Sequence, residues 1–179
     1  MNKRNGFSII ELLAVIFIIA LMALAAFAIF KNFRETTSVR VAARDVVNIM
    51  RLARQKAVTE REPYLAVYDC NNETIWVQSY SIYITSGKNP DFGTEQALPD
   101  MAIIARVKAG TGGQASNPGT PDPNPMDAAD TGTAYHKFSP KSTVTAGSVW
   151  LKDKGLKNFY KVTLKSPTAR ARIYDSWED

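Results

Sequence analysis

Two residue types that build catalytic and metal sites are almost missing from this chain of 179 residues. It has one cysteine, Cys70, and one histidine, His136. A single cysteine excludes an intramolecular disulfide and a cysteine-rich metal site. A single histidine excludes paired-histidine metal sites and leaves little for acid–base catalysis, and no nucleophile motif surrounds His136 and Ser139. The sequence therefore predicts no metal site, no cofactor and no enzymatic activity.

Helix-breaking residues are also absent from a long N-terminal stretch, since no proline or glycine occurs between Gly6 and Pro63. Within it, Phe7 to Phe30 is a run of 24 residues in which only Ser8 and Glu11 are polar. A helix of this length spans about 36 Å, and the hydrocarbon core of a bilayer is about 30 Å thick. Residues 7–30 are therefore predicted to be a single transmembrane helix that stays in the mature protein.

The helix is predicted to continue beyond the membrane over residues 31–62 as an amphipathic segment. Small and branched apolar residues recur there at steps of three and four, which is typical of one buried helix face. They are Val39, Ala42, Val46, Ile49 or Met50, Ala53 and Ala57. Four arginines lie largely off this stripe and could contact neighbouring subunits: Arg40, Arg44, Arg51 and Arg54.

The pattern changes to strands after Pro63, which indicates a β-rich globular domain over residues 63–179. Strands are predicted at 64–68, 74–78, 80–84, 102–107, 148–151, 159–165 and 169–174, with a hairpin turn at 70–73. Glycine and proline dominate residues 110–132, which predicts a mobile loop, and its aspartates match no calcium-loop spacing. The expected fold class is α+β, a long N-terminal helix packed on antiparallel β-sheets.

Positive charge is concentrated near the C-terminus, although the net charge is only +5. Residues 137–172 hold nine Lys and Arg against one acid, whereas residues 62–136 hold three against nine acids. Such an excess either attracts an anionic partner or is a solvated sheet face. The cations that could neutralise phosphates are Lys161, Lys165, Arg170 and Arg172.

Glu11 is unusual because an ionisable group inside an apolar helix is costly and needs either a partner or access to the headgroups. Together with its surroundings, Gly6-Phe7-Ser8-Ile9-Ile10-Glu11-Leu12-Leu13, it resembles the class III signal of prepilins. The resemblance implies that residues 1–6 are a leader, that prepilin peptidase cuts after Gly6, and that Phe7 is methylated. It also implies that Glu11 meets the Phe7 ammonium of a neighbouring subunit during assembly, as the physics of a buried charge requires.

A second resemblance covers about residues 45–175. The helix-to-sheet junction at Leu52 to Ala57 before Pro63, with a Phe138-Ser139-Pro140 segment and paired C-terminal arginines, is similar to GspH/FimT minor pseudopilins. It implies a minor pilin or pseudopilin subunit of a type II secretion pseudopilus or a type IV pilus. Its partners would be other pilins and prepilin peptidase.

Two further points follow from that resemblance. The expected location is the bacterial inner membrane, with a single pass and a periplasmic C-terminal domain, because positive charge slightly favours an internal N-terminus. The alternative is a FimT-like, DNA-binding minor pilin for DNA uptake, through Arg170 and Arg172. The family pattern there is Gly-Arg-x-Arg, and this chain has Ala169 in place of the glycine.

Overall fold

The computed structural model describes residues 9–91, 93–110, 113–115, 131–141, 143–155, 157–166 and 170–175, with backbone alone for 27–29 and 31–32. The chain divides into two compact units, Met1–Arg34 and Glu35–Asp179. We call them the helical unit and the sheet unit. The helix α1 (Ile9–Glu60) contributes residues to both.

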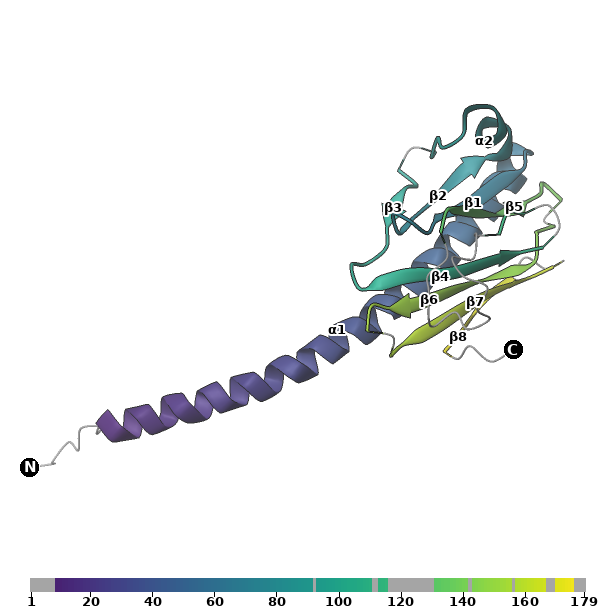
Figure 1. The fold of residues 1–179 in the computed structure, drawn as a ribbon. Coiled ribbons are helices and arrows are strands. Elements are labelled where there is room, and N and C mark those ends of the chain that lie inside the picture. The colour runs from purple at the N-terminus through teal and green to yellow at the C-terminus, as the bar shows by residue number, and fades with distance from the viewer. Residues whose placement is uncertain are drawn as a thin grey trace, which may run out of the picture. The chain divides into compact units, whose positions relative to one another are not determined.

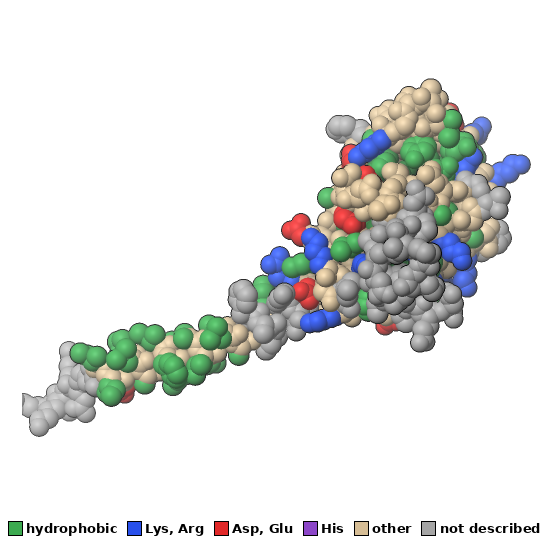
Figure 2. Space-filling view, viewed as in Figure 1, with side chains coloured by type: hydrophobic (Ala, Val, Ile, Leu, Met, Phe, Trp, Pro, Cys, Tyr) green, Lys and Arg blue, Asp and Glu red, His purple; other side chains and the backbone are tan. Residues whose placement is uncertain are grey.

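The helical unit contains the apolar part of α1. Residues Ile9–Ala26 have a mean hydropathy of 2.9, and none of this segment is buried. Hydrophobic side chains accordingly cover this part of the helix in Figure 2. Its length and composition suffice to cross a membrane. An uninterrupted helix is expected here, because leucine and alanine are strong helix formers and no proline or glycine intervenes.

The sheet unit holds two antiparallel four-stranded sheets, drawn as separate layers in Figure 1. The first sheet has the order β3-β2-β1-β5, with β1 (Tyr64–Asp69), β2 (Thr74–Ser79), β3 (Gln96–Ala97) and β5 (Thr133–Phe138). The second sheet has the order β4-β6-β7-β8, with β4 (Ala102–Ala109), β6 (Gly147–Asp153), β7 (Phe159–Lys165) and β8 (Arg170–Tyr174). The α+β fold class is confirmed.

Both sheets share one hydrophobic core with the outer half of α1. Every member of the predicted apolar stripe is buried, and Ala42, Ala53 and Ala57 have no exposed surface. Inner-face residues of the second sheet, such as Val149 and Leu164, belong to the same cluster. Small side chains let the sheet backbones approach the helix closely, so the alanines position both sheets.

The prediction of a strand over Tyr80 to Ile84 is wrong, because these residues begin the short helix α2 (Tyr80–Ser86). Tyr80 and Tyr83 lie three positions apart and pack against a second hydrophobic cluster, formed by Leu65, Val67 and Trp76. Gly87, at a φ of 73°, follows the last turn. Helix and strand patterns are hard to tell apart in so short a segment, and packing of both tyrosines on one cluster favours the helix.

The remaining predicted strands and the turn at 70–73 are confirmed, and two further strands were not predicted. One is β3, of two residues; the other is β5, whose side chains alternate between half-buried and buried. The predicted loop at 110–132 lies largely outside the described residues. Of its described part, Gln114 forms an isolated antiparallel bridge with Tyr135.

Candidate functional site

The predicted processing residues Gly6 and Phe7 lie outside the described residues, and Glu11 lies in the first turn of α1. Glu11 is exposed between apolar neighbours, of which Ile10 is 75% and Leu12 is 55% exposed. A carboxylate in a first helical turn is stabilised by the unpaired N–H groups and the helix dipole. Within the described part of the chain no hydrogen bond or ion pair engages Glu11, so its carboxylate is open to an external partner.

The C-terminal cations are brought together by the pairing of β7 with β8. Lys165 lies opposite Arg170, and Thr163 lies opposite Arg172. Because Val162 and Leu164 are buried, the alternate residues of β7 and their partners on β8 occupy the outer face of the sheet. Three of the four cations predicted to bind phosphate, Lys165, Arg170 and Arg172, are exposed there.

Lys161 behaves differently from these three. It is only 8% exposed, and its ammonium lies 5.2 Å from the ring centre of Trp150, directly opposite on β6. A cation over an indole face is stabilised by the ring quadrupole. Lys161 is therefore held against Trp150 on the outer face and is less accessible to a large ligand than the other three cations.

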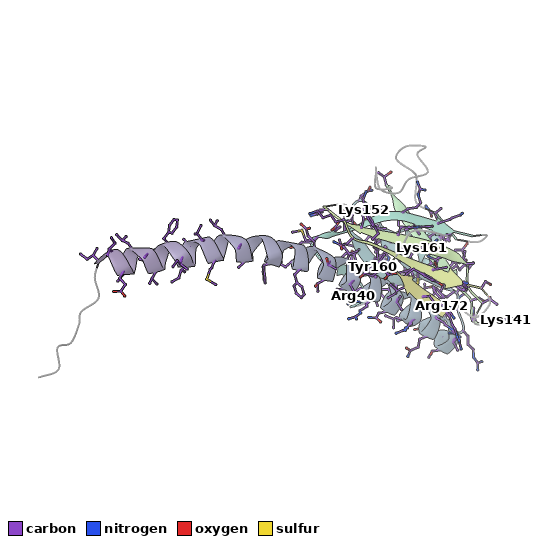
Figure 3. All side chains as sticks on the ribbon, turned by 90° about the horizontal axis from the view of Figure 1, so that it is seen from below. Arg40, Lys141, Lys152, Tyr160, Lys161 and Arg172 are labelled. Carbon is purple, nitrogen blue, oxygen red and sulfur yellow. The ribbon has the colours of Figure 1, made fainter. Side chains whose placement is uncertain are left out.

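A groove lies between β8 and the outer turns of α1, and it brings two of the helix arginines to the strand arginines. Its volume is about 660 Å³. The lining residues are Arg51, Arg54, Gln55, Val58 and Thr59 of α1 with Arg170, Ala171 and Arg172 of β8. In Figure 3, Arg172 lies on β8 beside these turns of the helix. We call this feature the arginine groove.

None of the described residues that line the arginine groove is acidic. Among the described residues, none of its four arginines has an ion pair, since the ion pairs there join Lys56 to Glu60 and Asp91, and Lys88 to Glu95. Arginine binds carboxylate or phosphate through two parallel N–H donors. Within the described part of the chain, the groove is therefore bordered by arginines whose hydrogen-bonding capacity is unused.

The proximity of Arg51 and Arg54 to Arg170 and Arg172 was not predicted from the sequence. The helix arginines were predicted to lie off the buried stripe, and Arg51 is exposed as expected. Their proximity to β8 depends on tertiary structure, because the order of the second sheet makes β8 its edge strand, which lines the groove with α1.

His136 is held in a structural setting. It is fully buried on β5, its Nε2 lies 3.3 Å from the carbonyl oxygen of Lys108, and its ring packs edge-on against Tyr68 at 5.5 Å between centres. Burial lowers the pKa of His136 to about 4. No hydrogen bond joins it to Ser139, and no group of three His, Cys, Asp or Glu side chains in the described ranges is arranged to hold a metal.

Comparison with known proteins found a family model that matches the N-terminal residues and solved structures that share the fold. Residues 1–27 match the family model of the prokaryotic N-terminal methylation motif. Two solved structures of the minor pseudopilin EpsH from the type II secretion system of Vibrio cholerae share the fold. One is 12% identical, covers 79% of this chain and 99% of its own, and has a TM-score of 0.50. The other is 13% identical, covers 80% and 98%, and has a TM-score of 0.53.

No curated protein sequence matches the chain at a significant level. The chain thus joins a prepilin N-terminal motif to the fold of a GspH-type minor pseudopilin, which confirms the resemblance predicted from its sequence.

Proposed function

We propose that this chain is a minor pseudopilin, a non-enzymatic subunit that α1 inserts into a type II secretion pseudopilus or a related type IV pilus. The observation that supports this most is the methylation motif at residues 1–27, which includes a helix segment with no buried residues, in a chain with the EpsH fold. In this proposal, residues 1–6 are the leader, 7–30 cross the inner membrane, 31–62 continue the helix, and 63–179 form the periplasmic domain.

In this proposal, Glu11 makes a specific ionic contact between subunits during assembly. Cleavage after Gly6 places an ammonium on Phe7 at the membrane edge, and the carboxylate of Glu11 is exposed one helical turn further on. An opposite charge from a neighbouring subunit satisfies both groups where few other partners exist. The pair therefore contributes more in a bundle of helices than in lipid, where Glu11 reaches headgroups or is protonated.

Processing is tested by mass spectrometry of the protein from its native host. We expect a mature chain that begins at N-methylated Phe7. Gly6→Val should retain the leader, and Asn5→Ala, beside the cleavage site, should be processed normally. A chain that still begins at Met1 while prepilin peptidase is active would contradict the proposal.

Assembly is tested with Glu11→Ala, using Leu13→Ala as the control on the same part of α1. Glu11→Ala should enter the membrane and lose its leader, because the helix becomes more apolar and the cut is five residues away. It should fail to co-purify with the other pilin subunits, whereas Leu13→Ala should co-purify. Native co-purification of Glu11→Ala would show that the charge pair does not drive assembly.

The FimT-like alternative, DNA binding by Lys161, Lys165, Arg170 and Arg172, stays a prediction. Lys161 is buried, which leaves three of these cations available to phosphates. Nonspecific affinity for DNA depends on the number of phosphates that are neutralised, so the loss of one cation weakens it. DNA is therefore included as a competing ligand in the experiment described next.

A further inference from the structure

We propose that the arginine groove binds an extended acidic segment of another protein, which adds as a strand to the free edge of β8. This inference concerns the sheet unit alone and does not depend on cleavage at Gly6 or on filament assembly.

The charge of the groove selects an anion. Arg51 and Arg54 line it from α1 on the inner side of β8, and Arg170 and Arg172 line it from β8 with their side chains on the outer side of the sheet. None of the described lining residues carries a carboxylate. Like charges around one recess repel one another, and a negatively charged ligand removes that repulsion. A carboxylate forms two parallel hydrogen bonds with a guanidinium group, so acidic side chains fit these four donors.

The backbone of β8 selects an extended chain. β8 is the last strand in the order β4-β6-β7-β8, and among the described residues it pairs only with β7. No described strand pairs with its other edge, whose N–H and C=O groups lie next to the groove, and proteins usually cover or blunt such edges. Side chains near the strand's end are also open, since Ile173 is 41% and Tyr174 is 37% exposed. Strand addition to an exposed sheet edge is a common mode of peptide recognition.

The two requirements together predict a strand with acidic side chains on both of its faces. Successive side chains of an added strand point to opposite faces of the sheet. Those on the outer face would lie beside Arg170 and Arg172. Those on the inner face would lie beside Ala171 and the helix residues Arg51, Arg54 and Val58. A nucleic acid has no backbone that pairs with a strand, so the structure favours a polypeptide.

Binding is measured by fluorescence anisotropy with the full chain in nonionic detergent micelles. The probe is a labelled peptide of about six residues that repeats Glu-Glu-Val and so has acids on both faces, since strands are typically about five to six residues long. One comparison peptide repeats Gln-Gln-Val, and so removes the charge. A second repeats Glu-Glu-Pro, and so keeps the charge but pairs poorly with a strand. We expect the Glu and Val peptide to bind most tightly.

Paired substitutions locate the site. Arg51→Ala with Arg54→Ala, and Arg170→Ala with Arg172→Ala, should each weaken binding about tenfold, which corresponds to two partly solvated ion pairs. The matched control is Arg40→Ala with Arg44→Ala, which removes the same charge from an exposed part of α1 outside the groove. The control should bind nearly as wild type. Circular dichroism establishes that each variant keeps its sheet structure.

Three results would overturn the proposal. Equal binding of the Glu and Pro peptide would show that charge alone is recognised, without strand addition. Equal weakening in the Arg40 and Arg44 control would show that binding follows net charge and not the groove. Tighter binding of a short DNA duplex, lost in the Arg170 and Arg172 variant, would assign the groove to nucleic acid instead. Because the peptide comparison uses wild-type protein, it remains decisive even where a variant folds poorly.

Discussion

Acidification should change the stability of the sheet unit through two groups that act in opposite directions. The first is His136, which burial keeps neutral by lowering its pKa from 6.5 to about 4. Its Nδ1 has no hydrogen-bond partner among the described residues, and the nearby Lys108 carbonyl compensates only in part. The unfolded chain therefore takes up a proton first as the pH falls. Stability from His136 is present above pH 6.5 and is lost toward pH 4, by about 2 kcal/mol between pH 7 and pH 5.

The second group is Glu73, at the end of the β1–β2 turn. Burial raises its pKa from 4.5 to about 7, against a hydrogen bond of 2.7 Å that the Ile104 N–H donates to its carboxylate. A raised carboxyl pKa means that stability is present below pH 4.5 and is lost as the pH rises through 7. Acidification from pH 7 to pH 5 should therefore restore about 1 kcal/mol, half of the linkage value, because the group is partly exposed and screened.

Single substitutions separate the contributions of His136 and Glu73 to the change of unfolding free energy with pH. The free energy of unfolding is measured in urea with the full chain in micelles, by the fluorescence of tryptophan, of which Trp76 is buried. From pH 7 to pH 5, wild type should lose about 1 kcal/mol, Glu73→Gln about 2 kcal/mol, and His136→Gln should gain about 1 kcal/mol. Differences between variants cancel the other titrations, including that of Asp45, whose pKa burial also raises. If both variants keep the wild-type slope, burial does not control these two groups.

Three further predictions concern packing, and urea midpoints at pH 7 check each of them. Ala53→Leu should cost about 2 kcal/mol, because Ala53 has no exposed surface between α1 and the sheets, whereas Val58→Leu on the exposed face should cost little. Gly147→Ala should destabilise by about 3 kcal/mol, since its Cβ would lie 2.1 Å from the Lys108 oxygen, while Gly155→Ala, with 3.3 Å to its nearest atom, serves as the control. Trp76→Phe should cost about 1 kcal/mol through the hydrogen bond from Nε1 to Gln78, and a stability equal to wild type would contradict this role.

The local sequence pattern correctly predicted those helices and strands whose buried residues follow the period of the helix or strand itself. The helix followed from the absence of proline and glycine before Pro63, and β7 followed from strict alternation between apolar and polar residues. The strand prediction at Tyr80 was wrong because aromatic and branched residues favour strands, whereas packing on the cluster that contains Trp76 favours a helix here. Tertiary context overrides propensity most easily in such short segments.

The candidate site could be predicted only in part for a similar reason. Arg170 and Arg172 were chosen from their local charge, and they do lie on one exposed strand. Their meeting with Arg51 and Arg54 depends on which strand ends the second sheet, and no local pattern carries that information. The burial of Lys161 depends likewise on the register that places Trp150 opposite it.

The unburied apolar surface of Ile9–Ala26 has an energetic consequence for any membrane in which the helix lies. Lipid chains and the side chains of other helices are almost equally apolar, so moving this surface from one to the other releases little hydrophobic free energy. For this segment, lipid and the surfaces of other apolar helices are therefore nearly equivalent environments. The hydrophobic effect therefore neither holds this helix in the lipid nor drives it against other helices, and any preference between them must come from packing and polar contacts.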